Sequence, residues 1–348
     1  MSRGDRPERP GRRPTQREIA RRLGLSPATV SLALRDNPMI SAETRRLVRE
    51  AIAEAGYVRN VSAAALRTGR SRIVGVSFHN IAHQFFAEML IAIEETLGAA
   101  GLSVFINNHG EQAPSLARFV ETLSAHGAEG LLVSPPPHVG PEILAPIAER
   151  GTPVVYVSRR IREDERADWV VNADRTAMAR AAGRLLSLGH RHIALVGGQP
   201  GNTVAEERVA GFREALEGAG IGWDARLWRQ CRPRLIEGGA ATRALLAEAP
   251  RVTGLVAFND LVAFGAMNAA RSMGVEPGRD LGVVALGGTE EAAAYHPALT
   301  TVLDNPAKIG RLAAEMLLQR LEEPGAPPRR IALDPKLVIR ASCGAPPG

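Results

Sequence analysis

The chain has 348 residues, of which 45% are hydrophobic and 23% charged, and its formal net charge is +6. This length exceeds what one hydrophobic core usually serves, so we expect two or three folded units. No apolar run approaches the roughly 18 residues of a membrane helix, and two cysteines, Cys231 and Cys343, give no support to a disulfide framework or a zinc site. We therefore expect no membrane partner, no cofactor and no metal.

The charge is unevenly distributed along the chain. Residues 1–70 contain 15 Arg and 7 Asp or Glu, a net charge of +8, so residues 71–348 carry a net charge of −2. A basic amino end on a slightly acidic body is typical of a protein that meets a polyanion; the alternative is a solvated charged tail. Residues 1–14 lack an apolar segment, so we expect a disordered basic arm rather than an export signal, and a cytoplasmic protein.

Two short helices are predicted after the arm. Thr15 and Glu18 form a capping box for a first helix, and Gly24 follows its end, where a left-handed conformation is easiest. Ser26 caps a second helix that has Pro27 at its first position. The side chains expected to pack inward from the second helix are Ala28, Val30 and Leu34.

A third helix is predicted from Ser41 to Ala55, with Gly56 as its stop. Helix, tight turn and helix together match the helix-turn-helix arrangement that enters the DNA major groove. Three small helices also fit a purely structural bundle, but the basic charge favours a DNA-binding domain over residues 15–58. The apolar face predicted for the third helix consists of Leu47, Val48, Ala51 and Ile52.

The segments "TQREIARRLGLSPATVSLAL" (15–34) and "ISAETRRLVREAIAEAGYVRN" (40–60) resemble the amino-terminal module of LacI-family transcription regulators. The resemblance continues in order through "SAAALRTGRSRIVGV", "FFAEML", "GHRHIALVGG", "ERVAGFREAL", "AFNDLVAFGA" and "PALTTV", and so covers nearly the whole chain. It implies a transcriptional regulator, most often a repressor, that binds a palindromic operator in double-stranded DNA as a homodimer and responds to a small-molecule effector.

The second helix is poor in groups that read bases. Between Ser26 and Leu34 it has no Arg, Lys, Asn or Gln, and Leu32 stands where the family often has an arginine that reads guanine. Its short hydroxyls suit phosphate contacts, and Pro27 and Ala28 offer only apolar contact to a thymine methyl. We therefore assign base discrimination to Arg35, to Gln16, to the arm and to DNA shape. The DNA-binding residues predicted in this region are Thr15, Gln16, Ser26, Pro27, Ala28, Thr29, Ser31 and Arg35.

Residues 59–71 are predicted to be a hinge helix and linker. Asn60 can cap a short helix over 62–66, and Gly69 ends it. The family resemblance implies that this helix forms on DNA, pairs with its twin and inserts Leu66 into the minor groove, which kinks the duplex. Ala63 permits the close approach of the two helices. The alternative is a plain spacer.

From Ile73 onward, short apolar runs alternate with helical segments. The alternation predicts parallel sheets with crossover helices, in two successive lobes over residues 72–344, with a tail at 345–348. The strand "TTVL" (300–303) and the helix over 306–321 are expected to cross between the lobes. The fold class is thus α/β, an all-α helix-turn-helix head on a body like a periplasmic binding protein. The predicted strands are "IVGVSF", "SVFINN", "GLLVS", "PVVYVS", "HIALVGG", "GLVAF", "LGVVAL" and "TTVL".

Signals of an enzyme are weak. The stretch "GGQPG" lacks the spacing and the lysine of nucleotide-binding loops, and no nucleophile–base set stands out. The adjacent carboxylates of Glu206 and Glu207 are expected to point apart on a helix and to be solvated. His79 and His83 lie four residues apart, which is half a metal site without a third ligand. We predict no catalytic residues and no enzyme.

In such folds ligands bind at the carboxyl ends of the strands, in the cleft. The resemblance implies that Phe85 and Phe86 wall an effector and that Arg208 clamps one of its polar or anionic groups. It also implies that Asp260, beside Asn259, accepts hydrogen bonds from the effector. The alternatives are a core role for Phe85, a surface position for Arg208 and a helix-capping role for Asp260. The predicted effector residues are Phe85, Phe86, Ser158, Arg159, Arg208, Asn259 and Asp260.

The chain departs from the family where carboxylates are common. Ser158 stands in place of an aspartate, and Gly287 and Gly288 stand in place of an acidic pair. His79 and Asn80 replace a common Pro-Asp. We therefore expect a pocket that is less acidic and that prefers an apolar or anionic ligand to a plain hexose. The alternative function is a sugar-type binding receptor without a DNA role.

Overall fold

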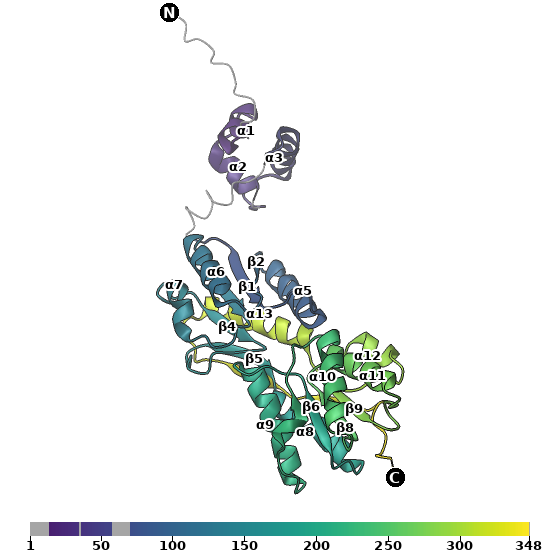
Figure 1. The fold of residues 1–348 in the computed structure, drawn as a ribbon. Helices are drawn as coiled ribbons and strands as arrows, with labels where there is room; N and C mark the ends of the chain where they lie inside the picture. The colour runs from purple at the N-terminus through teal and green to yellow at the C-terminus, as the bar shows by residue number, and fades with distance from the viewer. Residues whose placement is uncertain (1–13, 35, 58–69, 348) are drawn as a thin grey trace, which may run out of the picture. The chain divides into compact units, whose positions relative to one another are not determined.

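The structure is a computed structural model that describes residues 14–34, 36–57 and 70–347 (Figure 1). The chain divides into two compact units, Met1–Ser71 and Arg72–Gly348. Among the described residues no helix is both long and apolar enough to cross a membrane. The predictions for the arm, for Arg35 and for the hinge residues Asn60, Ala63 and Leu66 lie outside the described residues.

The first unit contains the three predicted helices, α1 (Gln16–Arg22), α2 (Pro27–Ala33) and α3 (Ala42–Ala55). The capping box of α1 is complete, since the Glu18 amide donates to Thr15 Oγ1 at 3.3 Å and the Thr15 amide donates to Glu18 Oε2 at 2.6 Å. Ser26 caps α2, and Gly56 ends α3 in the left-handed region with φ of 59°. The predicted helix boundaries are therefore confirmed.

Two of the inward-facing predictions are wrong. Ala28 is exposed, because it lies two residues before the buried Val30 and so on nearly the opposite side of α2. Leu47 is 42% exposed, since the two seven-residue helices cover only the side of α3 that carries Val48 and Ala51. The buried core of this unit consists of Ile19, Ala20, Val30, Ala33, Val48 and Ala51.

The first lobe of the second unit is a six-stranded parallel sheet in the order β11-β5-β4-β3-β1-β2. Helices α5 and α13 pack on one face, and α6 and α7 pack on the other (Figure 1). Its elements are β1 (Ile73–Phe78), α5 (Gln84–Ala99), β2 (Ser103–Asn108), α6 (Ala113–Ala125), β3 (Gly130–Val133), η1 (Pro141–Leu144), α7 (Ala145–Ala148), β4 (Val154–Val157), β5 (Asp168–Asn172), α13 (Pro306–Glu322) and β11 (Arg330–Leu333).

The second lobe repeats this plan in the strand order β12-β10-β9-β8-β6-β7. Its pairs are parallel except β10 with β12, and helices cover both faces. Its elements are α8 (Asp174–Ser187), β6 (Ile193–Val196), α9 (Thr203–Gly218), η2 (Ala225–Leu227), β7 (Trp228–Arg229), α10 (Leu235–Glu248), β8 (Gly254–Ala257), α11 (Asp260–Ser272), β9 (Gly282–Gly287), α12 (Glu290–Ala294), β10 (Thr300–Leu303) and β12 (Lys336–Val338).

The chain passes between the lobes three times, after β5, after β10 and after β11. The prediction that the tail segments cross is confirmed, because β10 belongs to the second sheet and α13 packs beside α5 on the first. The predicted strands are all present, but β5, β7, β11 and β12 are additional. The carboxyl ends of both sheets consequently meet at the crossings, where a ligand cleft is expected.

Candidate functional site

The amino end of α2 is the exposed polar tip of the first unit. Ser26, Pro27 and Ala28 are exposed there, whereas Thr29 and Ser31 are half-buried. Ser26 Oγ accepts the Thr29 amide at 3.0 Å and lies 2.8 Å from Thr29 Oγ1, so these hydroxyls already bond to each other. The tip therefore presents a small, nearly uncharged surface.

Gln16 joins the first two helices. Its side chain is half-buried, and Nε2 donates to the Pro27 carbonyl at 3.3 Å, while Thr15 beside it serves as the cap of α1. The structure thus brings these two predicted DNA-binding residues to the same end of the domain as the tip of α2. A Gln16 side chain that reads a base must first give up its contact with Pro27.

A cavity of about 150 Å³ lies between the two lobes, at the carboxyl ends of their strands. Every residue predicted for the effector site lines this cavity. The predicted residues along its wall are Phe85, Phe86, Ser158, Arg159, Arg208, Asn259 and Asp260. His79, Gly287 and Gly288, at which the chain departs from the family, also line it. The lining residues that were not predicted are His83, Gln84, Glu88, Asn172, Asp174, Val204, Pro233, Phe258, Leu261, Thr289, Asp304 and Pro306.

Aromatic rings form the apolar part of this wall. Phe85 and Phe86 meet edge to face with ring centroids 5.0 Å apart. Phe86 is buried and packs with the core, but Phe85 is only half-buried. Phe258 adds a third ring from the second lobe, with the Arg208 guanidinium carbon 4.7 Å from its centroid. The cavity therefore has apolar surface on both lobes.

Arg208 is held by carboxylates rather than left open. Its Nε donates to Asp174 Oδ1 at 2.6 Å and its Nη1 donates to the Phe258 carbonyl at 2.5 Å, while Nη2 lies 3.6 Å from Asp304 Oδ1. Its side chain is 7% exposed, so it is not a surface arginine. Although burial opposes its charge, the two carboxylates keep the pKa of Arg208 above its ordinary value.

The expectation of a less acidic pocket is wrong. Asp174, Asp260, Asp304 and Glu88 all line the cavity. Asp260 is expected from the sequence, whereas Asp174, at the start of α8, and Asp304, directly after β10, are additional acids. The pocket is consequently rich in hydrogen-bond acceptors.

Asp304 is a carboxyl group of the cavity with a pKa near neutrality. Asn172 Nδ2 donates to Asp304 Oδ1 at 3.1 Å, across the crossing strands. Burial raises the pKa of Asp304 to about 7; the carboxylates of Asp174 and Asp260 add to this rise and Arg208 opposes it. A ligand with hydroxyl or N–H donors thus meets an acceptor whose charge depends on pH.

Asp260, the first residue of α11, accepts hydrogen bonds from the loop that follows β9 and from β10. Its Oδ2 accepts the amides of Gly288 at 2.7 Å and Thr289 at 2.9 Å, and Oδ1 accepts the Thr301 hydroxyl at 3.1 Å. A Cβ on Gly287, whose φ is 150°, would come within 2.6 Å of Asp260 Oδ2. The absence of a side chain at Gly287 therefore leaves room for the Asp260 carboxylate, whereas a Cβ on Gly288 would meet Leu303 instead.

The cap of α11 is Asn259, not Asp260 as the capping alternative supposed. Asn259 Oδ1 accepts the Val262 amide at 2.9 Å. Its amide nitrogen lies 3.3 Å from Nε2 of His83, which is itself the N-cap of α5 in the other lobe. Burial lowers the pKa of His83. The amino ends of two helices thus face each other across the cleft through neutral side chains.

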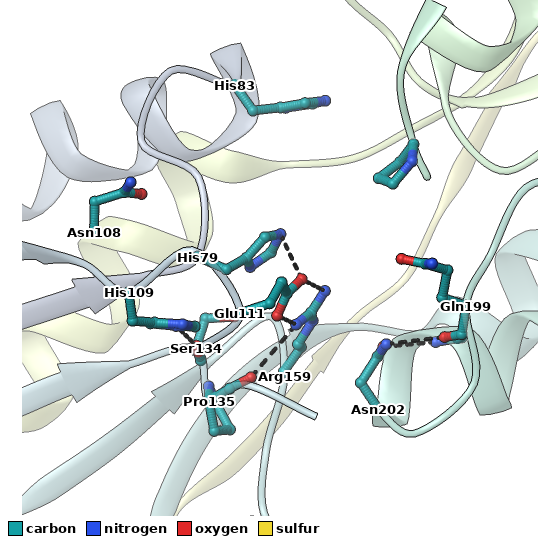
Figure 2. A network of polar contacts seen from close by, with 12 residues as sticks. His79, His83, Asn108, His109, Glu111, Ser134, Pro135, Arg159, Gln199 and Asn202 are labelled. Atoms are coloured by element: carbon teal, nitrogen blue, oxygen red, sulfur yellow. Dashed lines mark hydrogen bonds and ion pairs between the residues drawn. The ribbon is translucent and has the colours of Figure 1, made fainter. Parts of the chain in front are cut away.

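A second ion pair joins Arg159, in the wall of the cavity, to Glu111 of the same lobe, as Figure 2 shows. The Arg159 guanidinium donates both its terminal nitrogens to the Glu111 carboxylate, at 2.8 and 3.0 Å. His79 Nε2 lies 3.7 Å from Glu111, and burial, with Arg159 nearby, lowers the pKa of His79. The Arg159 side chain is 11% exposed, but that of its partner Glu111 is 39% exposed, so the ion pair is open to solvent on the Glu111 side.

Three buried polar atoms beside this pair have no hydrogen-bond partner among the described residues: His79 Nδ1, His109 Nδ1 and Ser134 Oγ. His109 Nε2 bonds to the Ser134 carbonyl at 2.9 Å (Figure 2). Such atoms are costly to bury alone, so they mark places where a water molecule or a ligand group fits. In the described part of the chain, no three metal-ligating side chains converge.

Adjacent carboxylates on α9 are paired as well as solvated: the Glu206 side chain is 50% exposed and that of Glu207 is 30% exposed. Arg162, in the loop after β4, donates to Glu206 Oε2 at 3.2 Å and to Glu207 Oε1 at 2.8 Å. Successive carboxylates point apart on a helix, but one long guanidinium at the helix start reaches both. This contact joins the two lobes.

Comparisons with known proteins agree with this architecture. The family model described as bacterial regulatory proteins of the lacI family matches residues 15–60, and the model of a periplasmic binding protein-like domain matches residues 182–343. The transcriptional regulator CelR of Thermobifida fusca is 31% identical over 337 residues, which are 95% of this chain and 98% of that protein. The resemblance inferred from the sequence is thus confirmed.

Solved structures of similar proteins cover nearly the whole chain. The lac repressor dimer bound to operator and an anti-inducer is 26% identical, with a TM-score of 0.85, and the match spans 96% of this chain and 100% of that one. A CelR complex with cellobiose is 27% identical, with a TM-score of 0.72, over 95% of this chain and 100% of that one. The chain belongs to the LacI family of bacterial transcription regulators.

Proposed function

We propose that this protein is a transcriptional repressor that binds an inverted-repeat operator as a homodimer and releases or grips it in response to a small molecule in the cleft. The observation that carries the proposal is a complete helix-turn-helix unit followed, in one chain, by a two-lobed body with a lined cavity. In this proposal residues 15–58 bind DNA, residues 59–71 form the hinge, and residues 72–344 bind the effector and form the dimer. A receptor without a DNA role does not account for the first unit.

DNA recognition is assigned to the tip of α2 and to residues beside it. The small tip favours phosphate and methyl contacts, which leaves base discrimination to Gln16, to Arg35, to the arm and to DNA shape, with Leu66 as the minor-groove wedge. Arg35 and Leu66 lie outside the described residues, so their roles rest on the sequence. Because its target is DNA, we place the protein in the cytoplasm, and we assign the cleft to binding without catalysis.

Exposed apolar side chains support dimer formation. β2 is an edge strand of the first sheet, and its Phe105 and Ile106 are 37% and 51% exposed; Ile91 of α5, in the same lobe, is 59% exposed. In the second lobe Ile236 of α10 is 77% exposed. Unpaired edge strands and apolar patches of this kind are usually covered by a partner. A second copy of the chain is the partner we propose.

The effector we propose is a small polyhydroxylated ring. Phe85 and Phe258 supply apolar surface, and Asp304 supplies an acceptor for hydroxyl donors. The solved CelR relative holds cellobiose. Arg208 contributes by holding Asp174 in place through Nε and by bonding to the Phe258 carbonyl through Nη1.

Selection of DNA by the full-length protein from a random duplex library tests the proposal. We expect an inverted repeat to be enriched, and its affinity to fall steeply with salt. Each neutralised phosphate adds about 0.9 to the slope of log K against log salt, so two heads with about four contacts each give a slope near −7. Absence of any preferred repeat, with and without added sugars, would contradict the proposal, and a slope near −2 would argue against a dimeric grip.

A further inference from the structure

The ion pair of Glu111 and Arg159 reaches across the carboxyl edge of the first sheet. Arg159 follows β4 and Glu111 follows β2, and the strand order places β3 and β1 between them. The terminal nitrogens of Arg159 donate to the Glu111 carboxylate at 2.8 and 3.0 Å, and Nη1 makes a longer contact of 3.5 Å with the Pro135 carbonyl (Figure 2). The Glu111 carboxylate therefore fixes where the positive charge of Arg159 lies.

The two members of this pair stand in different relations to the effector cavity. Arg159 is part of the cavity wall, whereas Glu111 is not among the described residues that line it. The Arg159 side chain is 11% exposed and that of Glu111 is 39% exposed. Glu111 thus acts on the cavity through the arginine, and it can be replaced without changing the wall itself.

Arg159 is a cation of the wall whose carboxylate partner lies outside the wall. The other guanidinium among the described lining residues, that of Arg208, pairs with Asp174 of the same wall at 2.6 Å. Burial lowers the pKa of both His79 and His83, so these lining histidines add no positive charge at neutral pH. The acidic groups of the described wall are Glu88, Asp174, Asp260 and Asp304. An anionic ligand consequently depends on Arg159 for a favourable charge.

We propose that Glu111 is a specificity-determining residue, which makes the cavity favour neutral polyhydroxylated ligands over anionic ones by occupying both terminal nitrogens of Arg159. The inference rests on the proposed function, since it concerns the effector bound in that cavity. An arginine recognises a carboxylate through the same paired donors that Glu111 engages. A ligand anion must therefore displace Glu111, and in the absence of Glu111 it becomes the partner of a largely buried cation.

A pair that only joins the strand ends predicts a different result. Loss of a structural contact lowers the stability of the lobe and weakens every ligand of the cavity alike. Loss of Glu111 as a specificity determinant instead changes the ratio of affinities, because an anion gains a free guanidinium and a neutral sugar does not. The ratio of anion to sugar affinity is therefore the measurement that separates the two roles.

Calorimetric titration of the full-length parent and of Glu111→Gln, in chloride of matched ionic strength, tests the proposal. The probes are glucose, glucuronate, which carries a carboxylate in place of the hydroxymethyl group, and inorganic sulfate, which needs no sugar pocket. We expect at least one of the two anions to bind Glu111→Gln about ten-fold or more tighter than the parent, with little change for glucose. If neither anion binds the variant more tightly, or if glucose gains equally, the proposal is overturned.

Glu121→Gln is the matched control, because Glu121 is an exposed glutamate of α6 in the same lobe. It makes the same change of net charge and should leave anion binding unchanged. A gain of equal size in this control would overturn the assignment to Glu111. The double variant Glu111→Gln with Arg159→Gln should lose the gain, and a gain that persists without Arg159 would contradict the route through the arginine.

Glu111→Gly is the second variant should Glu111→Gln fail to fold. The backbone of Glu111 has φ of 66°, a conformation that suits glycine, so this change removes the carboxylate without backbone strain. It must show the same tighter binding of an anion, and unchanged binding would overturn the proposal. No DNA is used in these titrations, so a negative result leaves the proposed repressor function untouched.

Discussion

The helix-turn-helix unit and the cleft differ in where their proposed binding residues lie: those of the first are on the surface, and those of the second are largely buried. The first unit has a core of six apolar side chains, and the residues proposed to meet DNA lie on its outside. In the cleft, charged groups are buried, and Arg208 with Asp174 both holds the lobe together and lines the cavity. DNA is too large to enclose, so its reader stays exposed, whereas a small ligand is recognised by surrounding it. The stability of the first unit therefore depends on apolar packing and caps, and that of the cleft on charge pairing.

The largest expected effect is that of Arg208→Ala. Removing one partner leaves Asp174 and Asp304 buried without compensation, which should lower the free energy of unfolding of the body by about 3–5 kcal/mol. Urea denaturation followed by circular dichroism measures the change. Arg243→Ala, at an exposed arginine of α10, is the control and should have almost no effect. If both variants unfold alike, charge pairing does not hold the cleft.

Ile19→Ala probes the first unit in the same way. Ile19 is 2% exposed in the six-residue core, and truncation of a buried isoleucine costs about 2–5 kcal/mol, a large share of what so small a unit has. We expect operator binding to be lost while the cleft still binds its effector, as measured by DNA anisotropy and effector titration. Leu47→Ala, at an exposed position, should leave the unfolding of this unit nearly unchanged.

Asp304→Asn tests whether ionisation of the buried Asp304 carboxyl group destabilises the folded protein. The folded-state pKa of Asp304 is raised from 3.8 to about 7, so the native state retains a proton that the unfolded chain has released in this window. Stability from this group is therefore lost as pH rises toward 7. Each pKa unit corresponds to about 1.4 kcal/mol, so the Asn variant should be more stable than the parent by about 1 kcal/mol or more above neutrality. Thermal unfolding across the window should show the difference growing with pH; a constant difference would contradict this assignment.

Thr15→Ala is expected to have the smallest effect. It removes the cap of α1 and should cost about 1 kcal/mol, seen as a lower melting temperature of the first unit. Thr15→Ser keeps the hydroxyl oxygen and should restore most of the loss. An Ala variant as stable as the parent would mean that the capping box contributes nothing measurable.

Part of the site could be predicted because its residues follow strand ends. Phe85, Arg208 and Asp260 were placed from motifs that resemble a family, and all three line the cavity. Asp174 and Asp304 also follow the ends of strands, which was an available signal. Asp174 is hard to predict because β5, the strand before it, begins with the charged Asp168, and Asp304 because the family-like motif "PALTTV" ends two residues before it.

The sequence by itself determined the helices, most strands and the order of the units, because caps, glycines and apolar periodicity act between residues a few positions apart. Only the tertiary structure decided which charges meet. Arg208 and Asp174 are 34 residues apart in the chain, and Asn172 and Asp304 are 132 apart. Such pairs form where the three crossings bring two sheets together, and the free energy of a buried charge depends on that final neighbourhood rather than on its neighbours in sequence.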